Sequence, residues 1–452
     1  MTPVVSRAGD RGLLLDFGSI DAAELHAHAA ALRERADVLA CIPGARSLYV
    51  VFDDRPDMDF ALGPVVQAQA HSRQHQIEVN FNGLDLTEFF GRVPPEEFFR
   101  RLPELELTAR YLGFRAAFAY LDGWPADWSM PRRPTSRSKV ARGTFAIAAN
   151  AAGFYPIDSP GGWNLLGQTD ARLWDASCSP PNLIAAGDRI RIIAVDRKIE
   201  LAAIVAELPE RAPAVKFTGA LTTAVTRPDW TRIREGRSPG GAFDVDEAEY
   251  ANALVGNDPD APLLECAMAG PRIALESARL VAWCGADSDL PQATAFSAAG
   301  TLEVGRIRNG LRGWLAIGEA GIDAKVTLSR LRPERNDRLT IRVAAGPHST
   351  PLREVTCEVT PQLNRVGIRL RPLGALPVSA PADLPSCGMQ FGTIQLHPDG
   401  TLVAMGPDHP ITGGYLQPLT VLWGERWKLA QLSPGERVTF VCVDLPADGH
   451  SP

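Results

Sequence analysis

The sequence Gly161-Gly162-Trp163, followed by Leu183-Ile184-Ala185-Ala186-Gly187-Asp188-Arg189-Ile190-Arg191-Ile192, occurs a second time in altered form. The second copy is Gly413-Gly414-Tyr415, followed by Leu432-Ser433-Pro434-Gly435-Glu436-Arg437-Val438-Thr439-Phe440. Each copy has two glycines and an aromatic residue, and then a Gly-Asp/Glu-Arg turn that opens an alternating strand. Two β-barrels of the same type would produce this echo. Convergent turn chemistry is the alternative, because glycine and an acidic residue commonly precede strands.

The sequence around these copies is typical of a barrel or sandwich. From Ile77 onward, short strand-like runs are broken by turn residues, and the chain has 40 Gly and 37 Pro. A helix is expected at about 245–255, with Asp244 as its cap, Glu247 three residues on and Gly256 at its end. The fold class predicted is therefore mainly β.

The first 53 residues differ from the rest. An apolar run, Leu13-Leu14-Leu15, precedes a stretch of helix formers at 21–39 that Asp21 is placed to cap. A run of strand formers, 47–52, then stops at two aspartates. This pattern predicts a small α+β domain at the N-terminus.

Composition excludes several classes of function. The net charge of −7 and the pI near 5.7 argue against nucleic-acid and anionic-membrane partners, which need a basic face. No apolar run approaches the roughly 20 residues that span a bilayer. Seven dispersed cysteines without a CxxC pair fit reduced thiols better than disulfides or a zinc site. We expect a cytoplasmic protein without a metal site.

Two segments place polar residues in glycine- and proline-rich turns. Arg132, Arg133, Arg137 and Lys139 form a positive patch suited to a carboxylate, phosphate or carbamate ligand. A solvated strand edge protected by charge is the alternative. In the second segment, Thr412–Tyr415, the glycines would let the backbone approach a ligand while Thr412 and Tyr415 donate hydrogen bonds. Its alternative is a tight hairpin.

In order along the chain, these and other blocks resemble the KipI–KipA family, the B and C accessory subunits of 5-oxoprolinase, also called allophanate hydrolase subunits 1 and 2. The KipI-like blocks are Arg7–Asp10, Ala45–Leu48, Leu112–Leu121, Pro131–Arg137, Gly153–Trp163 and Pro181–Asp188. The KipA-like blocks are Leu221–Thr223, Gly241–Asp244, Ala251–Asn257, Leu264-Glu265, Gly285–Asp287, Gly346-Pro347, Ile394-Gln395, Thr412–Tyr415 and Ala430–Gly435. The chain looks like a fusion of a KipI-like half with a KipA-like half, with carboxyltransferase-type domains.

The resemblance implies a small α+β domain followed by tandem cyclophilin-like β-barrels, three in all. We expect the α+β domain at 1–75, a KipI-like barrel at 76–207, and KipA-like barrels at 213–330 and 331–446. A stretch at 208–213 is expected to be a linker. The resemblance also implies a site where the KipI-like and KipA-like halves meet.

Relatives in this family open the lactam of 5-oxoproline with ATP, together with a LamB/YcsF-type subunit. The resemblance thus implies a hydrolase subunit whose ligand is a small carboxylate or lactam, with ATP supplied through the partner and no covalently bound cofactor. Catalytic roles are expected for Asp244, Lys139 and Glu265. Substrate binding is expected from Tyr120, Arg137, Trp163, Gln395, Thr412, Gly413, Gly414 and Tyr415.

The chain departs from the family pattern at several places. Ala116-Ala117-Phe118 replaces Pro-Gly-Phe, Ala149-Asn150-Ala151-Ala152-Gly153 replaces Gly-Gly-Gln-Thr-Gly, and Gln168 replaces an arginine. A family segment expected after Asp323 is missing. Because side chains in place of glycines can reshape a pocket, two other functions stay open. One is a stand-alone barrel enzyme or binding protein for another carbonyl or carboxylate compound, such as a cyclase. The other is a kinase-inhibitor-like interaction protein, and a homo-oligomer also stays open.

Overall fold

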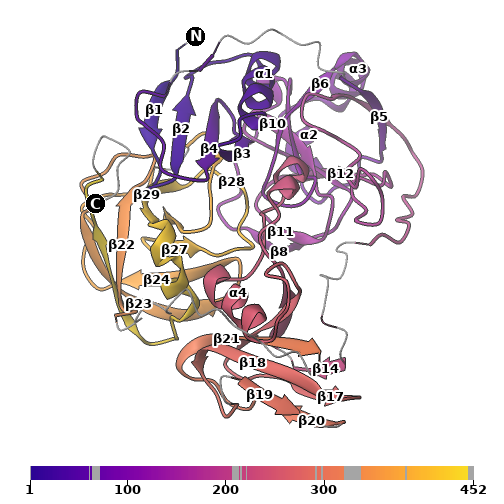
Figure 1. The fold of residues 1–452 in the computed structure, drawn as a ribbon. Coiled ribbons are helices and arrows are strands. Elements are labelled where there is room, and N and C mark those ends of the chain that lie inside the picture. The colour runs from indigo at the N-terminus through magenta and orange to yellow at the C-terminus, as the bar shows by residue number, and fades with distance from the viewer. Residues whose placement is uncertain are drawn as a thin grey trace.

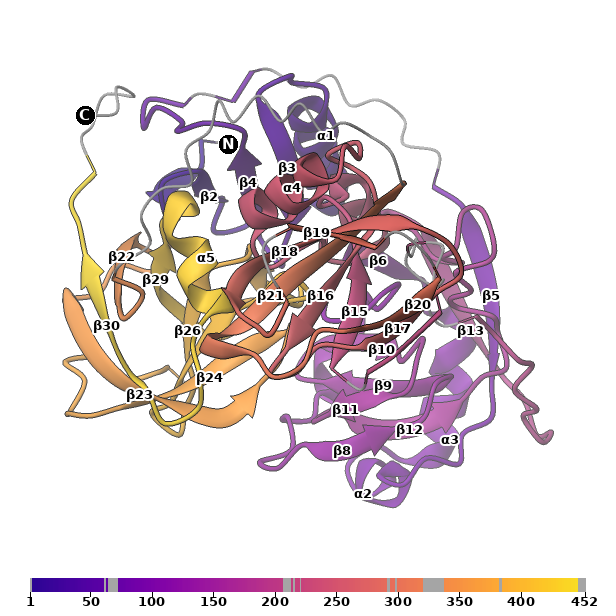
Figure 2. The same ribbon diagram turned by 60° about the horizontal axis from the view of Figure 1, so that its bottom comes forward.

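The chain folds into four parts that pack on one another (Figures 1 and 2). In this computed structural model, the described residues are 2–60, 62–63, 72–205, 213, 216–219, 221–290, 293–296, 299–319, 337–381 and 384–445. We call the parts the N-terminal domain (2–53), the first barrel (74–194), the middle unit (216–319) and the final barrel (340–442). In Figure 1, the N-terminal domain lies at the upper left, the first barrel at the right and the middle unit at the bottom.

The N-terminal domain is a four-stranded antiparallel sheet with one helix. The strands run in the order β1-β2-β4-β3 and are β1 (Val4–Arg7), β2 (Gly12–Asp16), β3 (Val38–Pro43) and β4 (Ser47–Phe52). Helix α1 (Ala22–Arg33) begins where the Asp21 side chain accepts a hydrogen bond from Ala23 N at 2.7 Å. Leu13 and Leu15 pack with this helix, whereas Leu14 faces the final barrel. The run is apolar throughout because both faces of the sheet are buried.

The first barrel has seven strands in the order β12-β9-β10-β7-β6-β13-β5. A bridge between Asn80 and Gln168 brings its two ends together. Rings of Phe89 and Phe98, from the short helices α2 (Leu86–Phe90) and α3 (Pro95–Arg101), enter its core. The strands are β5 (Gln74–Val79), β6 (Leu107–Leu112), β7 (Ala119–Asp122), β9 (Thr144–Ala148), β10 (Ala151–Phe154), β12 (Asn164–Gln168) and β13 (Arg189–Ala194), with the pair β8 (Arg137–Val140) and β11 (Ser159–Gly161) beside them.

The final barrel is closed, in the order β22-β29-β26-β27-β24-β23-β30. Its strands are β22 (Thr340–Ala345), β23 (Glu354–Leu363), β24 (Gly367–Pro372), β26 (Thr393–Leu396), β27 (Leu402–Met405), β29 (Leu416–Val421) and β30 (Arg437–Cys442). A two-stranded ladder, β25 (Cys387–Gly388) with β28 (Thr412–Gly413), is a separate sheet, and helix α5 (Arg426–Ala430) adds Leu429 and Ala430 to the core of the barrel.

The two barrels have the same topology. When the first barrel is read from β5 across its closing bridge, its strand order matches that of the final barrel position by position. Each barrel's last strand, β13 or β30, pairs in parallel with its first strand, β5 or β22. The echo in the sequence is therefore a structural repeat.

The repeated turns are built from the same contacts. Gly187 and Gly435 both adopt a positive φ, 92° and 85°. Their N–H groups donate to the carbonyl oxygens of Ala109 and Val359, at 2.7 and 2.8 Å. The acidic residue that follows accepts a hydrogen bond from the backbone N–H three residues earlier, and it binds an arginine just before the barrel's first strand. These pairs are Asp188 with Arg73 and Glu436 with Arg338.

The middle unit consists of two facing sheets. The three-stranded sheet is β14 (Lys216–Thr218), β17 (Arg272–Leu275) and β20 (Gly300–Glu303). The five-stranded sheet, in order, is β15 (Thr222–Val225), β16 (Leu263–Ala267), β21 (Arg308–Glu319), β18 (Arg279–Asp287) and β19 (Ala293–Phe296). Over its described residues this unit is a pair of sheets, whereas the resemblance implied a third barrel.

Helix α4 (Val245–Leu254) joins the middle unit to the final barrel. Ala248 and Ala251 pack against Trp314 of the five-stranded sheet, and this cluster continues into the interior of the final barrel. The Asp244 carboxylate caps the helix by accepting a hydrogen bond from Glu247 N at 3.2 Å. Gly256, with φ 72°, follows its last turn. The helix predicted at 245–255 is confirmed, with both of its ends.

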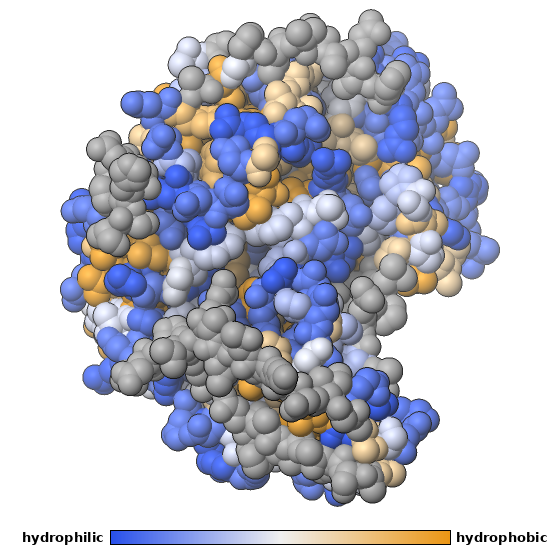
Figure 3. Space-filling model, viewed as in Figure 1, coloured by the Kyte–Doolittle hydropathy of each residue, from blue (hydrophilic) through white to orange (hydrophobic). Residues whose placement is uncertain are grey.

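The fold class, mainly β with a small α+β N-terminal domain and tandem barrels, is confirmed. Most of the expected linker at 208–213, the boundary at 330/331 and the position after Asp323, where a family segment is missing, lie outside the described residues. No described helix is long and apolar enough to cross a membrane. The face seen in Figure 3 is largely hydrophilic, with hydrophobic residues gathered mainly in its upper half.

Candidate functional site

Four aromatic side chains of the first barrel form what we call the aromatic cluster: Phe118, Tyr120, Tyr155 and Trp163. Phe118 lies edge-on to Trp163 and Tyr155, with ring centroids 5.4 and 5.3 Å apart, and Tyr120 lies 5.6 Å from Trp163. A Cβ on Gly161 would lie 2.1 Å from the Tyr155 hydroxyl oxygen, so the Gly-Gly-Trp turn needs glycine there to admit the ring. Burial raises the pKa of Tyr155 to about 12 and raises that of Tyr120 as well. Both phenols thus stay protonated near neutral pH, as hydrogen-bond donors.

The final barrel meets the aromatic cluster at Thr412, on β28. An interaction with the Thr412 side chain opposes part of the rise that burial causes in the pKa of Tyr120. Thr412 is only 2% exposed, yet its Oγ1 makes no full hydrogen bond to any described residue. Buried hydroxyls usually have a partner. The pair is therefore placed to bind a polar group of a ligand.

Two buried amide side chains of the final barrel, Gln395 and Gln417, lie near the β25–β28 ladder that carries Thr412. Gln395 Nε2 would be 2.9 Å from a Cβ on Gly413, and it lies 3.7 Å from Met389 Sδ. Gln417 Nε2 donates to Gly388 O at 3.3 Å, while its Oε1 is buried without a hydrogen bond to any described residue. This region thus offers the Thr412 hydroxyl and the Gln417 amide oxygen as hydrogen-bonding groups. The Gln395 amide and the Met389 thioether lie beside Gly413.

The last two residues of the Thr412–Tyr415 segment contact other residues of the final barrel. A Cβ on Gly414 would lie 2.8 Å from Leu384 O. The Tyr415 ring stacks on His397, with centroids 4.2 Å apart. His397 lies two residues beyond Gln395, and burial lowers its pKa to about 4, so the imidazole is neutral near pH 7. Tyr415 is therefore held by a neutral ring.

The basic segment is mostly neutralised by two aspartates. Asp85, 5% exposed, accepts hydrogen bonds from Arg137 at 2.7 and 2.8 Å and from Arg133 at 2.9 Å. Lys139 pairs with Asp158 at 2.8 Å, with its side chain 70% exposed. The Asp158 hydrogen bond raises the pKa of Lys139. Arg137 and Lys139 therefore already have anionic partners within the protein.

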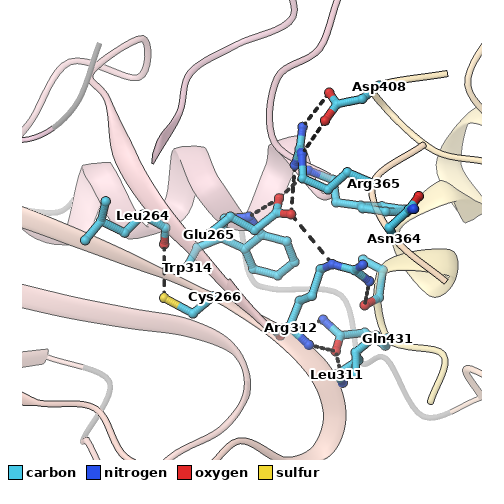
Figure 4. Close-up of polar contacts among 12 residues, drawn as sticks. Leu264, Glu265, Cys266, Leu311, Arg312, Trp314, Asn364, Arg365, Asp408 and Gln431 are labelled. Atoms are coloured by element: carbon cyan, nitrogen blue, oxygen red, sulfur yellow. Dashed lines mark hydrogen bonds and ion pairs between the residues drawn. The ribbon is translucent and has the colours of Figure 1, made fainter. Parts of the chain in front are cut away.

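Glu265 lies in a buried ion-pair network between the middle unit and the final barrel (Figure 4). Arg365 Nη1 donates to Glu265 Oε1 at 2.8 Å, and Arg312 Nε lies 3.6 Å from the same oxygen. Glu265 Oε2 accepts from Phe243 N at 2.8 Å and Trp314 Nε1 at 3.2 Å. The second partner of Arg365 is Asp408, at 2.7 and 2.9 Å.

The charges of this network balance, with two arginines and two carboxylates. Burial pushes the pKa of Glu265 up, but Arg365, Arg312 and the hydrogen bonds together lower it below its ordinary value. Burial lowers the pKa of Arg312 to about 10, so both arginines stay charged at neutral pH. Both Glu265 oxygens accept hydrogen bonds from protein groups, and the bond to Arg365 links the middle unit to the final barrel. Asp244, 3% exposed, caps α4 nearby in the sequence. The catalytic roles of Asp244, Lys139 and Glu265 stay predictions.

The structure thus brings together Tyr120, Trp163, Thr412, Gly413 and Gln395, at a junction of the two halves. We call this arrangement the junction site. Arg137 reaches its edge through a hydrogen bond to Trp163 O at 3.2 Å, and Tyr415 stacks on His397, two residues beyond Gln395. Sequence reasoning missed Asp85, Phe118, Tyr155 and Gln417. Phe118 and Tyr155 stand within KipI-like blocks, whereas no local signal marks Asp85 or Gln417. Among the described residues, no three His, Cys, Asp or Glu gather as metal ligands.

Two family models match the sequence in succession. The model "Carboxyltransferase domain, subdomain C and D" matches residues 3–184, and "Carboxyltransferase domain, subdomain A and B" matches residues 235–330 and 324–442. Similar solved structures include that of the protein TTHA0988, with a TM-score of 0.80 and 26% identity, covering 96% of this chain and 100% of that one.

Similar curated proteins divide between the two halves of a fusion. Two of them are 5-oxoprolinase subunits of type B. That of Haemophilus influenzae is 32% identical over 182 residues, 38% of this chain and 85% of that protein, and that of Bacillus subtilis is 27% identical over 224 residues, 43% of this chain and 93% of that protein. The 5-oxoprolinase subunit of type C from Escherichia coli is 25% identical over 264 residues, 47% of this chain and 85% of that protein. The chain belongs to the carboxyltransferase-domain family, as a fusion of two parts that are related to the type B and type C subunits of 5-oxoprolinase.

Proposed function

We propose that this chain is the fused KipI–KipA part of a 5-oxoprolinase, which binds 5-oxoproline at the junction site. The single observation that carries the proposal is the close packing of Thr412, from the KipA-like half, against Gly113, from the KipI-like half, near Tyr120. In relatives that are named as separate subunits, the corresponding halves are two polypeptides. A site built from both halves explains why they would be fused.

The chemistry of the junction site suits a small lactam. Its ring would lie against Trp163 and Phe118, which offer flat apolar surfaces. The lactam carbonyl would accept a hydrogen bond from the Tyr120 or Thr412 hydroxyl, and the lactam N–H would donate to Gln417 Oε1, which is buried and without a hydrogen bond among the described residues. Two hydroxyls beside a carbonyl oxygen also favour the negative charge that develops there when water attacks the ring.

In the proposed reaction the lactam C–N bond breaks, the hydroxyl of water joins the carbonyl carbon and a proton joins the nitrogen, giving glutamate. ATP hydrolysis to ADP and phosphate drives the opening. The sequence has no P-loop, so we assign ATP binding to a LamB/YcsF-type partner subunit. The relatives' names describe them as subunits, which is consistent with such a partner.

The test is reconstitution of the purified protein with LamB/YcsF-type subunits from bacteria that encode similar fusions. We expect ADP release that requires 5-oxoproline, ATP and both proteins, and that falls at least about tenfold in Tyr120→Phe, because a hydrogen bond made in the transition state is lost. Glu319→Gln, on an exposed ion pair of the middle unit, is the control. No turnover with any such subunit would contradict the proposal and would favour a stand-alone enzyme or binding protein.

A further inference from the structure

One cation beside the junction site has no anionic partner among the described residues. In the segment 131–139, Arg133 and Arg137 bind Asp85, and Lys139 binds Asp158. Arg132 makes no hydrogen bond or ion pair with any of the residues that the structure describes, and its side chain is exposed. The other three cations of this segment are paired with aspartates, so Arg132 is the one that is available to an anionic ligand.

Backbone and side-chain hydrogen bonds hold Arg132 against the aromatic cluster. Asn164 Nδ2 donates to Pro131 O at 2.9 Å, and Arg133 N donates to Gly162 O at 2.9 Å. The residues on both sides of Arg132 are therefore fixed to the residues on both sides of Trp163. Because Pro134 favours an extended backbone at Arg133, we expect the side chains of Arg132 and Arg133 to point in opposite directions.

The direction of Arg132 follows from that of Arg133. The Arg133 guanidinium reaches Asp85 at 2.9 Å, so we expect Arg132 to point to the opposite side, toward the aromatic cluster. The charge of Arg132 acts on both phenols of this cluster: it lowers the pKa values of Tyr120 and Tyr155, against the larger effect of burial. Geometry and electrostatics thus place the cation beside the aromatic cluster.

We propose that Arg132 binds the carboxylate of the ligand and so makes the junction site specific for small lactams or cyclic carbonyl compounds that carry a carboxylate next to the ring. This inference rests on the proposed function and names the residue that recognises the anion. A guanidinium can hold a carboxylate with two parallel hydrogen bonds. With the ring against Trp163, the carboxylate of 5-oxoproline would face Arg132 while its amide faced Thr412 and Gln417.

Calorimetric titration of the full chain with 5-oxoproline tests this inference through Arg132→Gln. We expect Kd to rise about tenfold to a hundredfold, the range for a lost hydrogen bond to a charged group. Arg132→Lys should lose less affinity, because it keeps the charge but not the paired hydrogen bonds. The neutral analogue 5-oxoprolinamide should bind Arg132→Gln and the unsubstituted protein within about twofold of each other.

Arg133→Gln is the matched control, because it removes the neighbouring guanidinium on the opposite side, and its Kd for 5-oxoproline should stay within about twofold. Binding of 5-oxoproline by the unsubstituted protein and Arg132→Gln with equal Kd would overturn the role of Arg132 and leave the proposed function standing. No binding by the unsubstituted protein would overturn the proposed function and this inference together.

Discussion

Gly113 of the first barrel lies directly against Thr412 of the final barrel. A Cβ on Gly113 would be 1.9 Å from Thr412 Oγ1 and 2.8 Å from Thr412 Cβ. No rotation of the threonine removes the second contact, because Cβ is fixed by the backbone. The junction site therefore depends on the absence of one side chain in the KipI-like half.

We expect Gly113→Ala to push the two halves apart at the junction and to lower the free energy of unfolding by about 3 kcal/mol, the upper range for overpacking. Chemical denaturation followed by tryptophan fluorescence measures the loss. Gly374→Ala is the control, because a Cβ there meets nothing within 4 Å. Equal stability of the two variants would show that the contact yields easily and does not fix the junction.

Two departures from the family pattern keep the backbone conformation of glycine. Ala117 and Ala149 have φ of 55° and 47°, the left-handed region where a Cβ costs about 1–2 kcal/mol. Ala149→Gly should therefore raise the free energy of unfolding by about 0.5–1 kcal/mol, after the greater entropy of an unfolded glycine is subtracted. Ala117→Gly should act in the same direction.

Ala146→Gly is the control for these variants, since Ala146 lies within strand β9 and glycine in a strand should destabilise. Thermal unfolding of the three variants measures the difference. A loss of stability in Ala149→Gly as large as that in Ala146→Gly would contradict a strained backbone at residue 149.

The Glu265 network predicts a large loss on substitution. Glu265→Gln leaves the buried Arg312 without an ion-pair partner among the described residues and leaves Arg365 with Asp408 alone, so we expect the free energy of unfolding to fall by about 3–5 kcal/mol. Removing Glu319 from its exposed pair with Arg279 should change it by less than about 1 kcal/mol. Urea denaturation of Glu265→Gln and Glu319→Gln makes the comparison. Similar small losses in both would mean that the network is not buried in solution.

The same carboxylate predicts a pH dependence. The pKa of Glu265 is lower in the folded protein than its ordinary value of 4.5, so its contribution is fully present above pH 4.5. That contribution is lost as the pH falls through the folded pKa. The stability of the unsubstituted protein relative to Glu265→Gln should therefore be constant from about pH 7 to 5 and should shrink below pH 4.5. A difference that grew on acidification would contradict the sign of the shift.

Much of the fold could be predicted from the sequence. The Gly-Gly-aromatic and Gly-acid-Arg echo predicted paired barrels because it encodes a turn with a positive φ at Gly187 and Gly435, which few other residues tolerate. Both ends of helix α4 were also predictable, because each depends on one local residue. The Asp244 side chain caps its start, and Gly256 adopts a positive φ after its last turn. Over its described residues the middle unit shows two sheets, and whether such sheets close into a barrel depends on pairing between distant strands, which local sequence does not encode.

The candidate site was predictable only in part. Family blocks led to Tyr120, Trp163 and Thr412, which the structure brings together across the two halves. Sequence alone could not pair Arg133 and Arg137 with Asp85, because that carboxylate lies far away in the sequence and is preceded by no motif. The positive patch is therefore smaller in the folded protein than the sequence predicted, and Arg132 is its one member without a partner among the described residues.

A shared ligand site makes one prediction that involves both halves at once. Calorimetric titration with 5-oxoproline would compare the unsubstituted protein, Tyr120→Phe from the KipI-like half, Thr412→Val from the KipA-like half and the double variant. We predict one site per chain and a Kd about tenfold weaker in each single variant. The combined loss should be smaller than the sum of the two, because the hydroxyls act on the same ligand group. Binding that neither substitution weakens would place the ligand elsewhere and contradict a site shared by the two halves.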